Sequence, residues 1–431
     1  MLYDYLTTNE EGRLVIGGVD VKDLAEEYGT PLYVLSEDRI RENCRKYTAA
    51  MAKYFPEGSF PLYAGKALCF KGIYPVIDDE GLGADVVSPG EIFTALAAGF
   101  PAEKLFFHGT NKTDSEIEYA LDCGIGCFVI DNMNELAALD KAAGEKGMKQ
   151  KALLRLTVGI DPHTFKAVQT GMIDSQFGIP IQTGQAEGFL KAALDAENIE
   201  VAGFHSHIGS QIMDSYQFCD QADILLEFAA DMKEKYGYTA EYFNIGGGFG
   251  VRYTEKDPTV DIEGNISDIA EHLAAGCEKA GLPVPKVLME PGRSIVADAG
   301  VTIYEAGGIK TVEGYREYVT IDGGMTDNPR FALYESEYTV LNASRADAPA
   351  DFECTVAGRC CESGDRIAED IMIARPERGD LIAVLGTGGY NYAMSMNYNR
   401  VPRPAMVMLS GGKARLVVRR QTFEDLISCE L

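Results

Sequence analysis

The stretch LFFHGTNKTDSEIEYALDCGIGCFVID, residues 105–131, contains one complete strand–helix–strand repeat. The apolar runs LFFHG (105–109) and CFVID (127–131) are predicted to be strands. Between them, Thr113 followed by Glu116 predicts a capping box at the start of a helix that runs through EIEYALDCG. This alternation is typical of a parallel sheet with crossover helices.

The same alternation extends from Pro61 to Gly292, and Ser88 with Glu91 predicts a second capping box. Eight strands are expected, which is the number that closes a TIM-type barrel. They are LYAGK (62–66), ADVVS (84–88), LFFHG (105–109), CFVID (127–131), ALLRL (152–156), GFHSH (203–207), YFNIG (242–246) and VLMEP (287–291). We therefore predict an α/β chain with a (β/α)8 TIM-type barrel.

After Gly292 the pattern changes to short apolar strands separated by Gly, Pro and Asp turns, which predicts a second, mostly β domain. The expected boundaries are 46–295 for the barrel and 296–431 for the β domain, with residues 1–45 as an N-terminal segment associated with the β domain. Its expected strands are PLYVLS (31–36) in the N-terminal segment, then 301–312, 316–321, 352–356, 381–385, 406–409 and 414–419.

Composition excludes several classes of protein. The 431 residues carry 39 Lys+Arg against 66 Asp+Glu, a net charge of −27, which argues against nucleic acid or an anionic membrane as a partner. No apolar run reaches the roughly 18 residues of a membrane span, and no signal-peptide pattern is present, so we expect a cytoplasmic protein. The ten cysteines lack paired CxxC spacing, which predicts neither a metal site nor disulfides.

Polar residues follow the expected barrel strands, at the barrel end where active sites form. Ser88 and Asp131, taken singly, are more simply explained as helix caps. As a set, however, these residues are poorly explained by structural roles alone. They are Lys66, Asp85, Ser88, His108, Asp131, Arg155, His205, His207, Gly246, Gly247, Gly248 and Glu290.

The chemistry of this set points to one cofactor. Lys66 after an apolar strand is expected to be desolvated, which favours the neutral amine of a Schiff-base lysine, although an ion-paired lysine is an alternative. The glycines of NIGGGFG (244–250) allow a phosphate or simply a tight turn. A carboxylate such as Glu290 keeps a pyridine nitrogen protonated, while His205 and His207 suit stacking or proton transfer. Together they indicate pyridoxal phosphate.

Several motifs in the expected order then resemble the barrel-type pyridoxal-phosphate decarboxylases, and within that family the diaminopimelate decarboxylases, over essentially the whole chain. They are YAGKA (63–67), GADVVSPGE (83–91), FHGTNK (107–112), HSHIGSQ (205–211), NIGGGFG and EPGRSIVADAG (290–300). The resemblance implies that Lys66 is the Schiff-base residue and His207 stacks on the pyridine ring. Asp85 belongs to the implied cofactor site, and Ser210 with Gly246–Gly248 holds the phosphate. Glu290 pairs with the ring nitrogen, and Arg293 contacts phosphate or substrate.

Segments of the β domain resemble the family's substrate-binding parts. DGGMTDNPRFALY (322–334) implies Arg330 and Tyr334 for the substrate carboxylate, and Tyr390 matches a cofactor-contacting tyrosine that also borders the substrate. CESGD (361–365) resembles a loop that reaches the neighbouring subunit's active site in a homodimer. There Cys361 lies near the reacting carbon and Glu362 binds the distal ammonium, while Cys360 packs.

The implied reaction is decarboxylation of meso-2,6-diaminopimelate to L-lysine and CO2, the last step of lysine biosynthesis, with Cys361 or Lys66 as proton donor. Three alternatives remain open. One is a decarboxylase of ornithine or arginine on the same fold, in which Arg330 would lack a carboxylate to bind. Another is a barrel-type racemase, which would place a cation rather than Glu290 at the ring nitrogen. The third is a non-catalytic regulatory homologue of such enzymes that binds pyridoxal phosphate, against which Lys66 argues.

Overall fold

A computed structural model of the chain describes residues 1–160 and 172–431. The described residues form two compact units. The barrel unit comprises Asn43–Gly250 and Thr259–Ser294, and the β unit comprises Met1–Glu42, Val251–Pro258 and Ile295–Leu431. The short stretch Val251–Pro258 thus belongs to the β unit, although barrel residues precede and follow it in the sequence.

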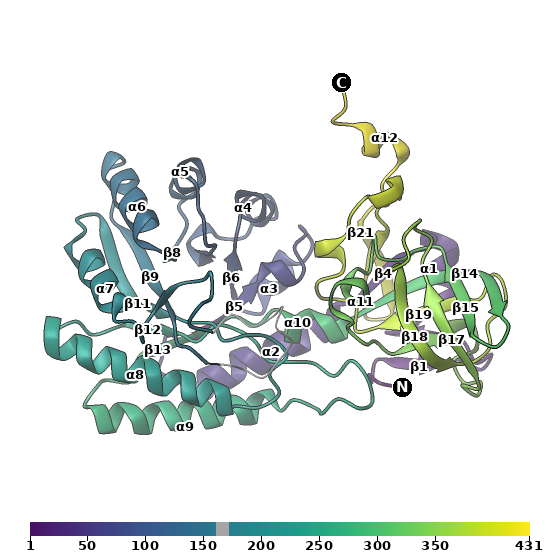
Figure 1. The fold of residues 1–431 in the computed structure, drawn as a ribbon, viewed down its shortest axis with the longest axis horizontal. Coiled ribbons are helices and arrows are strands. Elements are labelled where there is room, and N and C mark those ends of the chain that lie inside the picture. The colour runs from purple at the N-terminus through teal and green to yellow at the C-terminus, as the bar shows by residue number, and fades with distance from the viewer. Residues whose placement is uncertain (161–171) are drawn as a thin grey trace. The chain divides into compact units, whose positions relative to one another are not determined.

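Eight parallel strands close the barrel unit, which confirms the predicted (β/α)8 architecture (Figure 1). Pairing runs from β5 to β8 in order, then from β8 to β9, β11, β12 and β13, and β13 pairs back with β5. A two-residue strand, β10 (Ile179–Pro180), adds to β9. The barrel strands are β5 (Phe60–Ala64), β6 (Gly83–Val86), β7 (Leu105–Phe107), β8 (Cys127–Ile130), β9 (Gln150–Thr157), β11 (Ile199–His205), β12 (Tyr242–Asn244) and β13 (Lys286–Met289).

Several of these strands end one or two residues earlier than the sequence predicts. Lys66, His207 and Glu290 therefore lie in the turns that follow their strands, rather than at the last strand position. In barrels of this kind the active site forms in the loops that follow the strands. These residues therefore still lie at the functional end of the barrel.

Helices α4 to α9 lie around the strands (Figure 1). The predicted capping box of α5 is confirmed: the Thr113 hydroxyl accepts from the Glu116 N–H, and the Glu116 carboxylate accepts from the Thr113 N–H. At α4 only half of the predicted box forms, because Glu91 accepts from Val87 instead of Ser88. The helices of this region are α2 (Glu37–Tyr54), α3 (Tyr74–Asp79), α4 (Pro89–Ala97), α5 (Asp114–Cys123), α6 (Met133–Glu145), α7 (Gln185–Asp195), α8 (Tyr216–Tyr236), α9 (Ile262–Ala280) and α10 (Arg293–Val296).

The β unit is built on a nine-stranded sheet in which β4, from the N-terminal segment, lies between β14 and β20. A small sheet of β1 (Leu6–Thr8), β2 (Leu14–Ile16) and β3 (Val19–Asp20) precedes it. The large sheet contains β4 (Leu32–Ser36), β14 (Gly300–Val312), β15 (Arg316–Ile321), β16 (Val340–Asn342), β17 (Phe352–Ala357), β18 (Arg366–Ile373), β19 (Leu381–Leu385), β20 (Ala405–Ser410) and β21 (Lys413–Val418). Its helices are α1 (Val21–Tyr28), α11 (Arg330–Tyr334) and α12 (Phe423–Ile427).

Two strands of the large sheet, β16 and β18, and all three strands of the small sheet, β1 to β3, are absent from the sequence-based prediction. Strand β18 lies at the sheet edge and carries Arg366, Glu369 and Asp370, so it lacks the apolar run that marks a central strand. Strand β16 has only three residues. Among the described residues, no helix combines the length and hydropathy that crossing a membrane requires.

Candidate active site

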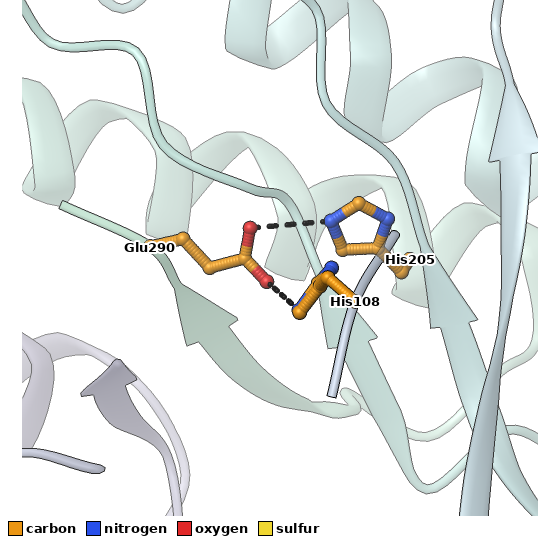
Figure 2. Close-up of side chains that lie close together, drawn as sticks. All are labelled: His108, His205 and Glu290. Carbon is orange, nitrogen blue, oxygen red and sulfur yellow. Dashed lines mark hydrogen bonds and ion pairs between the residues drawn. The ribbon is translucent and has the colours of Figure 1, made fainter. Parts of the chain in front are cut away.

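The Glu290 carboxylate, directly after β13, is held by three side chains that end or directly follow other barrel strands. His108 Nε2 lies 2.9 Å from Oε1, and His205 Nε2 lies 3.3 Å from Oε2 (Figure 2). Asn244, the last residue of β12, donates from Nδ2 to Oε1 at 2.7 Å. All four residues are buried, so the barrel wall fixes the position of this carboxylate.

The surroundings of Glu290 keep it ionised. Burial alone would raise the pKa of this carboxyl, but His108 and His205 outweigh burial and hold the pKa well below its usual range. Burial also lowers the pKa of His205 to about 4, against the opposing effect of Glu290, so this ring is neutral near pH 7. A neutral ring that donates from Nε2 to Glu290 uses its only N–H in that bond.

His108, His205 and Glu290 also place one potential metal-ligand atom each within 4.8 Å of one another. Two features favour the hydrogen-bonded arrangement over a metal. The carboxylate already accepts from Asn244, and His205 Nδ1 is buried without a hydrogen-bond partner in the described part of the chain. A metal-bound imidazole needs an acceptor for its second N–H.

Lys66 lies in the short 3-10 turn after β5, Gly65–Ala67, and its side chain is exposed. The expectation that the strand end desolvates Lys66 is therefore wrong, because the preceding β5 residues are buried but the lysine itself is exposed. Burial, with the Lys66 charge nearby, lowers the pKa of His207 well below its usual range. Burial raises the pKa of Asp85 on β6, and its Oδ1 has no hydrogen-bond partner among the described residues.

The glycine run after β12 passes through a space that has no room for side chains. A Cβ at Gly247 would lie 1.9 Å from the Glu290 carbonyl oxygen, and one at Gly248 would lie 2.6 Å from the Gly209 carbonyl oxygen. Gly246 has a φ of +69° and its N–H donates to Asn244 Oδ1 at 2.9 Å. The same asparagine thus fixes both the start of the glycine run and the Glu290 carboxylate.

Ser210 and Arg293, which the sequence places far apart, come together in the barrel unit. Arg293 Nε donates to Ser210 Oγ at 3.0 Å, and the arginine is buried. A hydroxyl and a guanidinium that lie side by side are suited to binding an anion such as phosphate.

In the β unit, two segments singled out from the sequence are joined through Asp365. Its carboxylate accepts from the Cys360 N–H and from the Met325 N–H, each at 2.6 Å. Cys360 is half-buried, whereas Cys361 and Glu362 are exposed. The CESGD loop is therefore tied to the segment that leads to Arg330, with its two candidate functional side chains pointing to solvent.

Arg330 begins α11 and is only 7% exposed, yet no carboxylate pairs with it among residues 1–160 and 172–431. Tyr334 and Tyr390 contact it: the Arg330 Cζ lies 5.8 Å and 5.5 Å from their ring centroids. A buried charge without a counter-ion is energetically costly, so this guanidinium is suited to binding an anionic ligand.

Two residues of these sites, Asn244 and Tyr253, are not among the candidates predicted from the sequence. Asn244 could have been found, because it directly precedes the glycine run. Tyr253 contacts Arg330 in the β unit but lies in a stretch that sequence position alone assigns to the barrel, so nothing in the sequence signals its role.

Comparison with known proteins agrees with this architecture. Residues 37–297 match the family model of the pyridoxal-dependent decarboxylase, pyridoxal binding domain. The chain is 43% identical over 423 residues to diaminopimelate decarboxylase of Bacillus subtilis (strain 168), which covers 98% of this chain and 96% of that protein.

Solved structures give the same result. The crystal structure of diaminopimelate decarboxylase from M. jannaschii in co-complex with L-lysine aligns with a TM-score of 0.90 and 33% identity, covering 99% of this chain and 98% of that one. Lysine/ornithine decarboxylase from Vibrio vulnificus, complexed with putrescine, aligns with a TM-score of 0.77 and 25% identity over 90% and 97% of the two chains.

The barrel unit also fits the cofactor of that family on its own geometry. The glycine run packs too closely against neighbouring backbone to carry side chains, so only its backbone groups can meet a ligand there. Glu290 is an ionised carboxylate on the barrel wall, and Lys66 offers an accessible amine. These groups match the phosphate, ring nitrogen and aldehyde of pyridoxal phosphate. The chain belongs to the diaminopimelate decarboxylases, which are pyridoxal-phosphate-dependent carboxy-lyases.

Proposed function

We propose that this chain decarboxylates meso-2,6-diaminopimelate to L-lysine and CO2 with pyridoxal phosphate as cofactor. The similarity to diaminopimelate decarboxylases over 98% of the chain supports the reaction. The structural observation that carries the choice of substrate is the buried Arg330 guanidinium, which has no carboxylate partner in the described chain. Diaminopimelate has a second carboxylate, and an α,ω-diamine precursor such as ornithine does not.

In this proposal the barrel residues bind and orient the cofactor. Lys66 would attach it through its amine, His207 would hold its ring, and Gly246–Gly248 with Ser210 and Arg293 would bind its phosphate. Asp85 would belong to the same cofactor site. Bound pyridoxal phosphate supplies an electron sink for the electron pair that remains when CO2 leaves. Glu290 strengthens that sink, because its ionised carboxylate accepts a hydrogen bond from a protonated ring nitrogen.

The residues proposed for the substrate lie in the β unit. Arg330 and Tyr334 bind the carboxylate at the far end, and the Glu362 carboxylate binds the ammonium there. Tyr390 would contribute to binding of both cofactor and substrate. The Cys361 thiol is proposed to deliver the proton that replaces CO2, with Lys66 as the alternative donor.

Replacing His108 with Ala is expected to weaken cofactor binding in acid. His108 lowers the pKa of Glu290, so its loss raises that pKa. As the pH falls, Glu290 of the variant becomes protonated sooner and can no longer accept a hydrogen bond from a protonated ring nitrogen. Cofactor affinity, measured by fluorescence titration of cofactor-free protein between about pH 5 and pH 8, should therefore decline at a higher pH than in the parent.

His272 provides the matched control for this experiment. It pairs with Asp223 at 2.8 Å on the exposed faces of α9 and α8, so His272→Ala also removes a histidine–carboxylate contact. That variant should titrate like the parent. Identical titration curves for His108→Ala and the parent would contradict the role given to His108.

Replacing Arg330 with Ala tests the substrate. Charge-assisted hydrogen bonds to a carboxylate are worth about 1.5–3 kcal/mol, so kcat/KM for meso-diaminopimelate should fall about 10- to 150-fold. Any slow turnover of ornithine, which has no distal carboxylate, should not fall. Initial rates of CO2 release with each substrate check this, and an equal loss with both would show that Arg330 acts on something common to the two.

The second candidate is a decarboxylase of ornithine or arginine. The structural likeness to the Vibrio vulnificus lysine/ornithine decarboxylase favours it, although identity is lower than for the diaminopimelate enzymes. Comparing kcat/KM for ornithine, arginine and meso-diaminopimelate on the same preparation decides between them.

We also propose a cytoplasmic homodimer with shared active sites. The support for the dimer is the resemblance of the CESGD loop, whose Cys361 and Glu362 side chains are exposed. Mixing an inactive Lys66 variant with an inactive Cys361 variant should restore part of the activity if subunits share sites. The cytoplasmic location rests on the sequence alone.

A further inference from the structure

The Arg330 guanidinium is held almost entirely by neutral groups. Its Nη2 donates to Ser336 Oγ at 3.2 Å, and its Nε is buried with no hydrogen-bond partner among the described residues. The side chain therefore has unused donors in a place from which water is largely excluded. Its orientation must come from contacts other than an ion pair.

Aromatic rings supply those contacts. The Arg330 Cζ lies 5.9 Å from the ring centroid of Tyr253, 5.8 Å from that of Tyr334 and 5.5 Å from that of Tyr390. Each distance is within the roughly 6 Å range of a cation–π interaction. Such contacts stabilise the charge without consuming its N–H groups, which leaves the donors available for a ligand.

Tyr253 is held at both its backbone and its ring. Its carbonyl oxygen accepts from the Thr339 N–H at 3.2 Å and from Thr339 Oγ1 at 2.9 Å. Its ring packs edge-on against Tyr338, with centroids 5.3 Å apart and planes at 85°. Both tyrosines are buried in the core of the β unit. Tyr334, by contrast, lies on the same short helix as Arg330, α11, so it cannot hold the guanidinium in place relative to the rest of the β unit.

We propose that Tyr253 is a positioning residue for substrate specificity: its ring holds the Arg330 guanidinium with free donors directed at the distal carboxylate of the substrate. This inference rests on the proposed function, because it takes the distal carboxylate of the substrate as the ligand of Arg330. It adds a residue from the stretch Val251–Pro258, which belongs to the β unit.

The test compares two ligands of the holoenzyme that differ only in the carboxylate. L-lysine, the proposed product, retains the distal carboxylate, and cadaverine lacks it. Tyr253→Leu removes the aromatic ring and should raise the Kd of L-lysine about tenfold, while the Kd of cadaverine stays unchanged. Tyr253→Phe keeps the ring and should bind L-lysine like the parent. With meso-diaminopimelate, Tyr253→Leu should raise KM with little change in kcat.

If Tyr253→Leu fails to fold, as judged by circular dichroism, phenylalanine and pentafluorophenylalanine at position 253 replace it. Fluorination removes the negative ring face at nearly constant shape, so the fluorinated variant should bind L-lysine more weakly than the phenylalanine variant. Failure of the parent to turn over meso-diaminopimelate would count against the proposed function. Equal L-lysine affinity in the parent and Tyr253→Leu, equal affinity in the phenylalanine and pentafluorophenylalanine variants, or an equal loss for cadaverine would overturn the role of Tyr253 and leave the function standing.

Discussion

Replacing Lys66 with Ala is expected to abolish decarboxylation, with a loss on the order of a thousandfold or more. The reason is chemical: without the amine, the cofactor loses its covalent attachment and the substrate has no amine to displace. The absorbance band of the protein-bound cofactor, which lies at a longer wavelength than that of the free cofactor, should disappear as well. Fold should be unaffected, because the side chain is exposed in the turn after β5.

Borohydride reduction of the parent holoenzyme, followed by digestion and mass spectrometry, locates the attachment. The modified peptide should contain Lys66. Lys71, an exposed lysine five residues along the same loop, is the matched control, and Lys71→Ala should retain both the band and the activity. Labelling at Lys71, or an active Lys66→Ala, would contradict the assignment.

Replacing Glu290 with Gln is expected to lower kcat about 100- to 1000-fold while the cofactor stays bound. Glutamine keeps the shape of the side chain but removes the negative charge that keeps the ring nitrogen protonated. The loss should appear in kcat and kcat/KM together, since the effect is on the electron sink rather than on substrate binding. Rates of CO2 release at saturating meso-diaminopimelate check this.

Glu241 is the matched control for that substitution. It is an exposed carboxylate that pairs with Lys286 at 2.9 Å at the beginning of the barrel strands, so Glu241→Gln removes an equal charge without touching the site. Its kcat should match the parent. A Glu290→Gln enzyme with parental kcat would contradict the role of this carboxylate.

Much of the barrel could be predicted from the sequence, because parallel strands buried on both faces are read as apolar runs and helix starts carry capping residues such as Thr113. The Glu290 cluster was only partly predictable. His108, His205 and Glu290 stand out as polar residues after apolar runs, but their mutual distances depend on the barrel closing and have no local sequence signal.

The sequence was least informative where burial and chain topology decide the outcome. Lys66 follows an apolar strand, yet one turn of 3-10 helix carries its side chain into solvent. Tyr253 lies between two barrel elements in sequence but packs in the β unit against Tyr338, a contact that no periodicity predicts. Strand β18 was missed because charged residues interrupt its apolar pattern at the sheet edge.

The most direct measurement is incubation of the purified holoenzyme with meso-2,6-diaminopimelate, with CO2 and lysine quantified over time. We predict one CO2 for each lysine, lysine of the L configuration only, and a kcat/KM far above that for ornithine or arginine. A cofactor-loaded enzyme that releases no CO2 from meso-diaminopimelate, or that prefers ornithine, would contradict it.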